Sequence, residues 1–190
     1  MINFQSLLDK YRIKADANML LDMWNESHRH YHNLDHLSDL IEQINESYGK
    51  NEINEKQKEI LSLVALFHDI IYEPKRFDNE ERSADFFINL CEDKASGDIL
   101  QIKYAILDTK EHKNSTLISE MFNKYDMSIC EKNFDELLKW EEGIKSEFVP
   151  HFGEDAYKLG RVEFLESLLD KYPNNTENLL KLIDTVDSDN

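Results

Sequence analysis

One stretch of the chain, LSLVALFHDIIY at residues 61–72, constrains the fold more than any other. Its apolar residues leave almost no polar face, so a helix through it must lie at the centre of a core. Asn54 and Gln57 stand at capping-box spacing and mark the start of this helix, and Pro74 stops it near Tyr72. The apolar run is too short and too interrupted to span a bilayer, so we expect no membrane contact.

The rest of the chain shows apolar residues at helical spacing and no convincing alternating strand pattern. Its 190 residues include only five Gly and three Pro, which favours long helices joined by short turns. We therefore predict an all-α, single-domain bundle over residues 1–185, fraying after Ile183 into an acidic tail at residues 186–190. The expected helices cover residues 4–11, 15–24, 34–44, 54–72, 79–90, 96–106, 117–122, 134–144 and, beyond Pro150, 157–169.

The net charge of −17 excludes one class of partner. A nucleic acid polymer would be repelled, because binding to it depends on clustered Lys and Arg. A small phosphorylated molecule is still compatible with the charge, since a metal ion can reverse the field inside one pocket. Two cysteines, Cys91 and Cys130, predict no disulfide framework, so we expect packing roles for both and a cytoplasmic protein without a signal peptide.

His68 and Asp69 form an ionisable pair inside the apolar stretch. A buried carboxylate costs several kcal/mol unless it is paired or bound to a metal. Nothing nearby in the sequence compensates Asp69, whereas a divalent cation would. The other ligands must then come from other helices, and the candidates are His36 upstream and Asp126 downstream. Two imidazoles and two carboxylates suit Mn, Fe, Co, Ni or Zn, with Mg left open for a second position.

Four more histidine positions cluster before residue 37: His28, His30, His32 and His36. His32 and His36 share one helix face if the helix begins by about residue 32. We interpret His28 and His30 as solvated or packing residues rather than ligands. Arg29 either fixes the entry to the helix through a carbonyl or binds phosphate.

Four sequence elements in this order carry a family resemblance: RHYHNLDH, LFHDIIYEP, DNEERSA and KYDMSI. Together they resemble the HD superfamily of metal-dependent phosphohydrolases, and most of all its small bacterial branch of predicted HD phosphohydrolases. The resemblance runs from about Arg29 to Arg161. The YHNxxH element at residues 31–36 is also similar to that of cyclic-nucleotide phosphodiesterases, although their glutamine region for the cyclic nucleotide is not recognisable.

The resemblance implies a site. It implies His36, His68, Asp69 and Asp126 as metal ligands, with one metal, or one tight and one weak, because a later histidine pair is missing apart from His112. A metal held there would acidify a bound water and polarise a phosphoryl oxygen. The resemblance also implies His32 as the general acid and places Asp69 and Glu80 among the catalytic residues, Glu80 having the alternative of a plain acid at a helix start.

Besides Arg29, three residues are candidates for contact with substrate phosphate. Lys75 and Arg76 lie on the loop after the HD pair, although exposed loop cations are common. His112, in DTKEHK with Thr109, is either a surface histidine or a contact to phosphate or to a second metal. Arg161 is expected to pair with an acid of the core helices, with phosphate binding as the lesser alternative.

The resemblance implies hydrolysis of a small phosphate ester, with a nucleotide as the favoured substrate. The alternative is a non-catalytic, metal-containing ligand-binding or sensor module of the same fold, which would have no need of a proton donor at His32. Di-iron oxygenase chemistry is less compatible with the shortage of histidines for a second metal. The expected partner is a small phosphate-bearing molecule, and a homodimer is left open.

Overall fold

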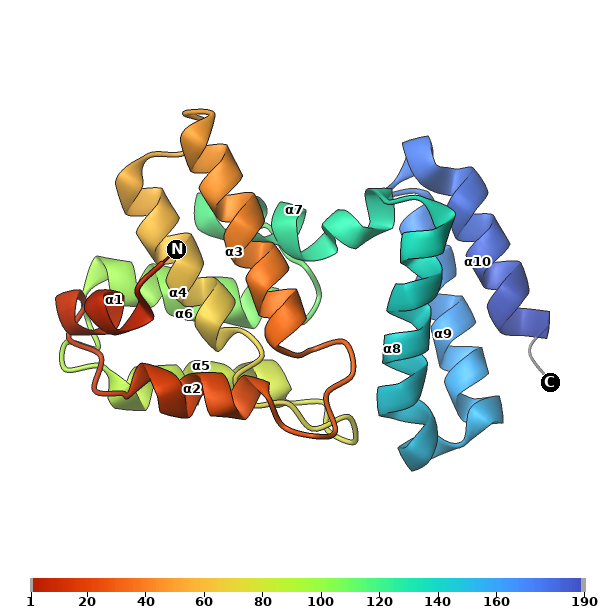
Figure 1. Cartoon of the computed structure of the whole chain (residues 1–190), viewed down its shortest axis with the longest axis horizontal. Helices are drawn as coiled ribbons and strands as arrows, with labels where there is room; N and C mark the ends of the chain where they lie inside the picture. The colour runs from red at the N-terminus through yellow and green to blue at the C-terminus, as the bar shows by residue number, and fades with distance from the viewer. Residues whose placement is uncertain (1, 189–190) are drawn as a thin grey trace. The chain divides into compact units, whose positions relative to one another are not determined.

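A computed structural model describes residues 2–188 and confirms the all-α prediction (Figure 1). Within these residues the chain forms ten α-helices and two short 3-10 helices, and a single bridge between Ile13 and Cys91 is the only β-type pairing. The chain divides into two compact units, residues 1–126 and 127–190. Nothing in the sequence pattern marks this division. The single domain predicted over residues 1–185 is not tested by it and stays a prediction.

Seven helices build the first unit. They are α1 (Phe4–Lys10), α2 (Ala17–Trp24), α3 (Leu34–Gly49), α4 (Glu55–Phe67), α5 (Asn79–Leu90), α6 (Gly97–Asp108) and α7 (Leu117–Asp126). The first four begin at side chains that accept hydrogen bonds from the backbone of the first turn, which is what Asn and Asp do best at this position. These capping residues are Asn3, Asp16, Asn33 and Asn54.

Helix α4 is the centre of the first unit, as its sequence predicts. Residues 60–67 are all buried, and α4 packs against α3, α5, α6 and α7. Asn54 and Gln57 form the expected capping box, in which each side chain accepts a hydrogen bond from the other residue's backbone N–H. Burial of each large apolar side chain contributes roughly 1.5–3 kcal/mol. The core therefore holds α4, and with it whatever lies at its C-terminal end, firmly in place.

The C-terminal end of α4 corrects one expectation. The apolar pattern predicts a helix to about Tyr72, but α4 ends at Phe67 and residues 68–73 form a turn and loop. The side chain of Trp24 reaches in from α2 and donates a hydrogen bond to the Leu66 carbonyl at 2.9 Å. Because this bond replaces one that another helical turn would supply, the chain can leave the helix five residues early.

The turn before α3 corrects a second expectation. Helix α3 begins at Leu34, and Asn33 is its N-cap, whose side chain accepts hydrogen bonds from the N–H groups of Asp35 and His36. His32 therefore lies in the turn that enters the helix, and it does not share a helix face with His36. A capping asparagine fixes the helix start here more strongly than the histidine spacing does.

Three α-helices and two 3-10 helices build the second unit. They are η1 (Met127–Glu131), α8 (Phe134–Phe152), α9 (Glu154–Leu169), η2 (Pro173–Asn175) and α10 (Thr176–Ser188). The expectation that Pro150 separates two helices is wrong, because Pro150 lies inside the last turn of α8. A proline there removes a single backbone hydrogen bond, and α8 ends instead at Gly153, whose φ of 79° favours glycine.

The expected fraying after Ile183 is also wrong for the residues that the structure describes. Helix α10 continues to Ser188, and both Ile183 and Val186 are buried. Apolar side chains spaced three residues apart give this segment a buried face despite its acidic composition. Residues 189 and 190 of the predicted tail lie outside the described range.

Candidate metal centre

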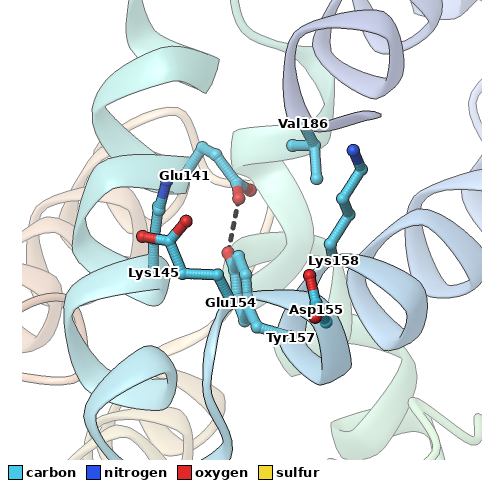
Figure 2. A pocket seen from close by; sticks show the side chains of 7 residues that line it. All are labelled: Glu141, Lys145, Glu154, Asp155, Tyr157, Lys158 and Val186. Carbon is cyan, nitrogen blue, oxygen red and sulfur yellow. Dashed lines mark hydrogen bonds between the residues drawn. The ribbon is translucent and has the colours of Figure 1, made fainter. Parts of the chain in front are cut away.

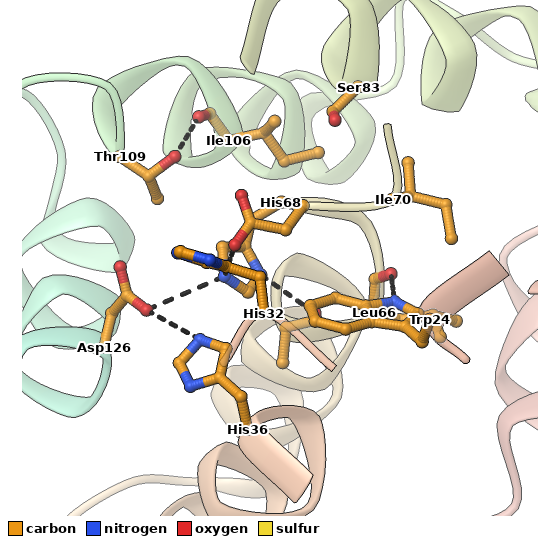
Figure 3. Close-up of polar contacts among 12 residues, drawn as sticks. Trp24, His32, His36, Leu66, His68, Ile70, Ser83, Ile106, Thr109 and Asp126 are labelled. Carbon is orange, nitrogen blue, oxygen red and sulfur yellow. Dashed lines mark hydrogen bonds and ion pairs between the residues drawn. The ribbon is translucent and has the colours of Figure 1, made fainter. Parts of the chain in front are cut away.

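The four predicted metal ligands come together in the first unit (Figure 3). His36 lies in the first turn of α3, His68 and Asp69 follow the end of α4, and Asp126 is the last residue of α7. Ligand atoms of His36, His68 and Asp69 all lie within 4.8 Å of one another. Oδ1 of Asp126 lies 3.2 Å from His36 Nε2 and 3.6 Å from His68 Nε2. The fold thus gathers two imidazoles and two carboxylates from three helices.

The two ring nitrogens of His68 have different surroundings. Nδ1 lies 3.0 Å from the carbonyl oxygen of Ala65, so it carries a hydrogen and donates it. Nε2 is fully buried and has no hydrogen-bond partner. It lies 3.2 Å from Asp69 Oδ2, without hydrogen-bond geometry. A backbone carbonyl that fixes one nitrogen as the donor leaves the lone pair of the other free, which is the usual arrangement of a metal-binding histidine.

The charges of the cluster shift its pKa values strongly. Burial by itself lowers the pKa of His68, but the carboxylates of Asp69 and Asp126 outweigh it and raise the pKa to about 9. Burial favours the neutral form of Asp69, yet the His68 imidazole outweighs it and lowers this pKa. Asp126 is partly buried, which raises its pKa, but hydrogen bonds from His112 and His36 outweigh this effect and hold the pKa well below the ordinary value. Without a metal, a proton on His68 offsets part of the negative charge of the two carboxylates.

His32 lies beside this cluster. Its ring stacks on the ring of Tyr72 with centroids 4.3 Å apart, and its centroid is 6.1 Å from that of His36. A Coulombic interaction with His32 is one of the causes that lower the pKa of Asp69. The predicted general acid is thus held next to the predicted ligands.

His112 also reaches the cluster. Its Nε2 lies 3.5 Å from Asp126 Oδ2, the carboxylate oxygen that faces away from His36. His112 has a φ of 50°, a left-handed conformation that is costly for a residue with a side chain. Its neighbour Thr109 is buried and donates its hydroxyl to the Ile106 carbonyl at 2.7 Å, so that hydroxyl caps α6. His112 is accordingly part of the cluster rather than a plain surface histidine, while contact with phosphate stays a prediction.

Glu80 lies in the first turn of α5, partly buried. Burial and the negative charge of Asp69 raise the pKa of Glu80, which places its carboxyl within electrostatic reach of the cluster. Its flanking motif residues have structural roles that the sequence did not reveal. The Asn79 side chain both donates to the Glu73 carbonyl and accepts from the Glu73 N–H, and Ser83 does the same for Ile71.

Lys75 and Arg76 are exposed on the loop between α4 and α5. Arg76 makes two hydrogen bonds to Asp78, at 2.6 and 2.7 Å, and its charge is engaged there. Their predicted contact with substrate phosphate stays a prediction.

The positions of His28 and His30 are consistent with their interpretation as packing or solvated residues rather than metal ligands. His28 Nε2 lies 2.9 Å from the Tyr72 carbonyl oxygen and its ring stacks on the Tyr72 ring, whereas His30 is exposed. Both cysteines are buried, as expected of packing residues, and burial raises the pKa of the Cys91 thiol to about 11.

The cluster fits a divalent metal ion. His36, His68 and Asp69 form a group that could hold one, and the unpartnered Nε2 of His68 supplies a lone pair directed at the carboxylates. Mixed nitrogen and carboxylate donors suit first-row transition metals without selecting one. Because the site already places two negative charges near the centre, a cation compensates them better than a single proton does.

The second unit contains a buried polar group of a different kind. The Glu141 carboxylate accepts hydrogen bonds from the Tyr157 hydroxyl and from Arg161 Nε, the latter at 2.7 Å, which confirms the expected pairing of Arg161 with an acid. The same group borders a pocket of about 210 Å³ that Lys158 and Val186 also line (Figure 2). The pair joins α8 to α9, so its role in the structure is to hold these helices together.

Comparisons of the chain with protein-family models, with curated proteins and with solved structures gave no significant match. Among the described helices, none combines the length and the apolar composition that a bilayer crossing requires.

Proposed function

We propose that the chain is a metal-dependent phosphohydrolase of the HD superfamily that acts on a small phosphate ester, with a nucleotide as the favoured substrate. The observation that carries the proposal is the buried His68 Nε2, which has no hydrogen-bond partner and faces Asp69 and Asp126. A buried nitrogen without a hydrogen-bond partner among carboxylates is costly in a native protein unless a ligand completes it.

His36, His68, Asp69 and Asp126 would hold the metal, which could be Mn, Fe, Co, Ni, Zn or Mg. When bound, such an ion acidifies a coordinated water and offsets the negative charge of a phosphoryl group. The Ala65 carbonyl keeps His68 in the tautomer that this role requires.

His32 and Glu80 would move protons. His32 sits against Tyr72, which restricts its ring to one plane, and a protonated His32 would donate its proton to the oxygen of the leaving group. Glu80, whose pKa is raised, would hold or accept a proton of the attacking water more readily than an exposed glutamate. Two titratable groups with differently tuned surroundings suit the donor and acceptor roles of a hydrolysis.

Substrate phosphate would be met by His112, on the outer oxygen of Asp126, and by Lys75 and Arg76 on the loop after the cluster. The net charge of −17 supports a small substrate over a nucleic acid polymer. We place the protein in the cytoplasm, and a homodimer is compatible with the proposal.

The test measures bound metal by elemental analysis in the wild type and in Asp69→Ala, together with phosphate release from a panel of mononucleotides and simple phosphate esters. Asp85→Asn is the matched control, because it removes an exposed carboxylate on α5 without touching the cluster. We expect metal and turnover in the wild type and the control, and neither in Asp69→Ala.

Equal metal content in the wild type and in a folded Asp69→Ala variant would refute the ligand assignment. A wild type that binds metal but releases phosphate from none of the esters would favour the non-catalytic sensor module instead.

A further inference from the structure

The end of α4 and the loop that follows it contain a row of backbone carbonyls that helical hydrogen bonds do not satisfy. Several of them are taken by side chains from other parts of the first unit. The pairs, in chain order, are Leu66 with Trp24, Asp69 and Ile70 with Arg29, Ile71 with Ser83, Tyr72 with His28 and Glu73 with Asn79. Arg29 is the donor that takes two neighbouring carbonyls, and one of them belongs to a predicted metal ligand.

The Arg29 guanidinium also reaches a second segment. Its Nη1 donates to the Asp69 carbonyl at 2.8 Å and to the His32 carbonyl at 3.1 Å, and its Nη2 donates to the Ile70 carbonyl at 3.1 Å. One planar group thus ties the turn that holds His32 to the turn that holds Asp69. Its Nε donates a further hydrogen bond to the exposed Glu26 carboxylate at 3.1 Å.

The surroundings of Arg29 hold it in this position. Its side chain is 0% exposed. The guanidinium carbon lies 5.4 Å from the ring centroid of Trp24 and 5.4 Å from that of Tyr72. A guanidinium between aromatic rings is held by cation–π attraction in addition to its hydrogen bonds. Because four of its five N–H donors are engaged by the protein and its side chain is fully buried, Arg29 is not placed to bind a substrate phosphate.

We propose that Arg29 is a positioning residue, which locks the turn of His32 onto the turn of His68 and Asp69 and thereby sets the metal affinity of the site. The inference rests on the metal centre of the proposed function, but not on any substrate. A lysine cannot replace Arg29, because a single ammonium cannot donate along the separate, fixed directions that a guanidinium offers. Residues that orient metal ligands typically change metal affinity by about 10- to 100-fold when they are replaced.

The experiment titrates the metal-free protein with Co²⁺ and follows binding by the visible absorption of the bound ion, while thermal unfolding of the metal-free protein is measured separately. Arg29→Lys and Arg29→Gln are the test variants. Glu26→Gln is the first control, because it alters the Arg29 partner that belongs to neither turn. Ser83→Ala is the second, because it removes buried hydrogen bonds from Ile71 in the same loop without touching Asp69 or Ile70.

We expect both Arg29 variants to bind Co²⁺ about 10- to 100-fold more weakly and with an altered absorption spectrum. Glu26→Gln should keep the wild-type affinity. Ser83→Ala should lower the unfolding temperature of the metal-free protein and keep the affinity for the ion. Arg29→Gln leaves no buried charge behind, so it provides the comparison even where Arg29→Lys does not fold.

Wild-type affinity in Arg29→Gln would overturn the inference and leave the metal centre intact. The inference would also be overturned if Ser83→Ala lost Co²⁺ affinity in the same proportion to its loss of thermal stability as the Arg29 variants do. Arg29 would then act on the site only through the general stability of the protein. A wild type that binds no metal ion of any kind overturns the metal centre itself and this inference with it.

Discussion

The two units each bury a group of charged residues, and they satisfy it differently. In the second unit, both oxygens of Glu141 are taken, one by the Tyr157 hydroxyl and one by Arg161. Arg161 Nη2 has no hydrogen-bond partner, but the guanidinium lies 4.1 Å from the Trp140 ring centroid, where a cation is favourable. In the first unit, His68 Nε2 lies near two carboxylates and has no hydrogen-bond partner.

The comparison teaches how to separate a structural charge cluster from a ligand site. A complete cluster contains its own opposite charge, as Glu141 and Arg161 do for each other. An incomplete cluster carries an excess of one sign, which here is the negative charge of Asp69 and Asp126. The missing component is positive, and a metal ion or a proton on His68 can supply it. The predictions below test whether the difference between the two clusters is real.

The largest expected effect is on metal binding. His68→Ala removes the unpartnered Nε2, and we expect the metal affinity to fall by more than about 100-fold, because even residues behind the ligands cost up to that amount. Isothermal titration with Co²⁺ measures it. His151→Ala, which removes an exposed histidine on α8, is the control and should bind like the wild type. If His68→Ala binds Co²⁺ as well as the wild type, the cluster of the first unit is not a metal site, and it is a structural charge cluster like that of the second unit.

Glu141→Ala should have the next largest effect, on stability alone. It leaves Arg161 buried without its acid, which typically costs about 3–5 kcal/mol. Urea unfolding measures the loss, and Glu142→Ala, an exposed neighbour, serves as the control. Metal affinity should stay at the wild-type value. A change in metal affinity would contradict the separation of the two clusters.

The metal-free protein should lose stability as the pH rises. The pKa of His68 is raised from its ordinary 6.5 to about 9, so its contribution is fully present below pH 6.5 and is lost as the pH rises through 9. The loss is on the order of 3 kcal/mol. Unfolding in urea with a chelator, between about pH 6 and pH 9, measures it. Saturating metal should abolish the alkaline loss, because the ion then replaces the proton, and a flat profile without metal would argue against a protonated His68.

At acidic pH the metal-free protein should instead lose stability as the pH falls. The lowered pKa values of Asp69 and Asp126 contribute stability above their ordinary value of 3.8, and this contribution is lost as the pH falls.

The smallest effect is expected at the other end of α4. Asn54→Ala removes the capping box and should cost about 1 kcal/mol of stability. Because the core holds α4 along its length, the metal affinity should not change. Thermal unfolding and Co²⁺ titration together check this, and Glu55→Ala, which stays outside the capping box, is the control. A drop in metal affinity would mean that the cluster depends on the whole helix rather than on its C-terminal end.

Local features of the sequence determined the helical class, the start of α4 and the burial of the pair at its end. Apolar spacing and the Asn54–Gln57 box act over neighbouring residues, so they can be recognised without the fold. The need to compensate the charge of Asp69 can also be recognised without the fold, because its apolar neighbours are adjacent to it in the sequence. His36 and Asp126 were candidates from the sequence, and the family resemblance implied the same two residues. Their approach to His68 became visible only in the structure.

Only the tertiary structure decided where α4 stops and what orients its last residues. Trp24 and Arg29 capture carbonyls about forty positions further along the chain, and no local pattern marks such hydrogen bonds. The unpartnered Nε2 of His68 has the same origin, because it depends on which atoms surround a buried nitrogen. Helix periodicity is a property of adjacent residues, whereas hydrogen-bond satisfaction in a core is settled by every segment that packs there. The sequence therefore determined that the charge of the His68–Asp69 pair must be compensated. The packing of the first unit determined how the two side chains are held in place for that.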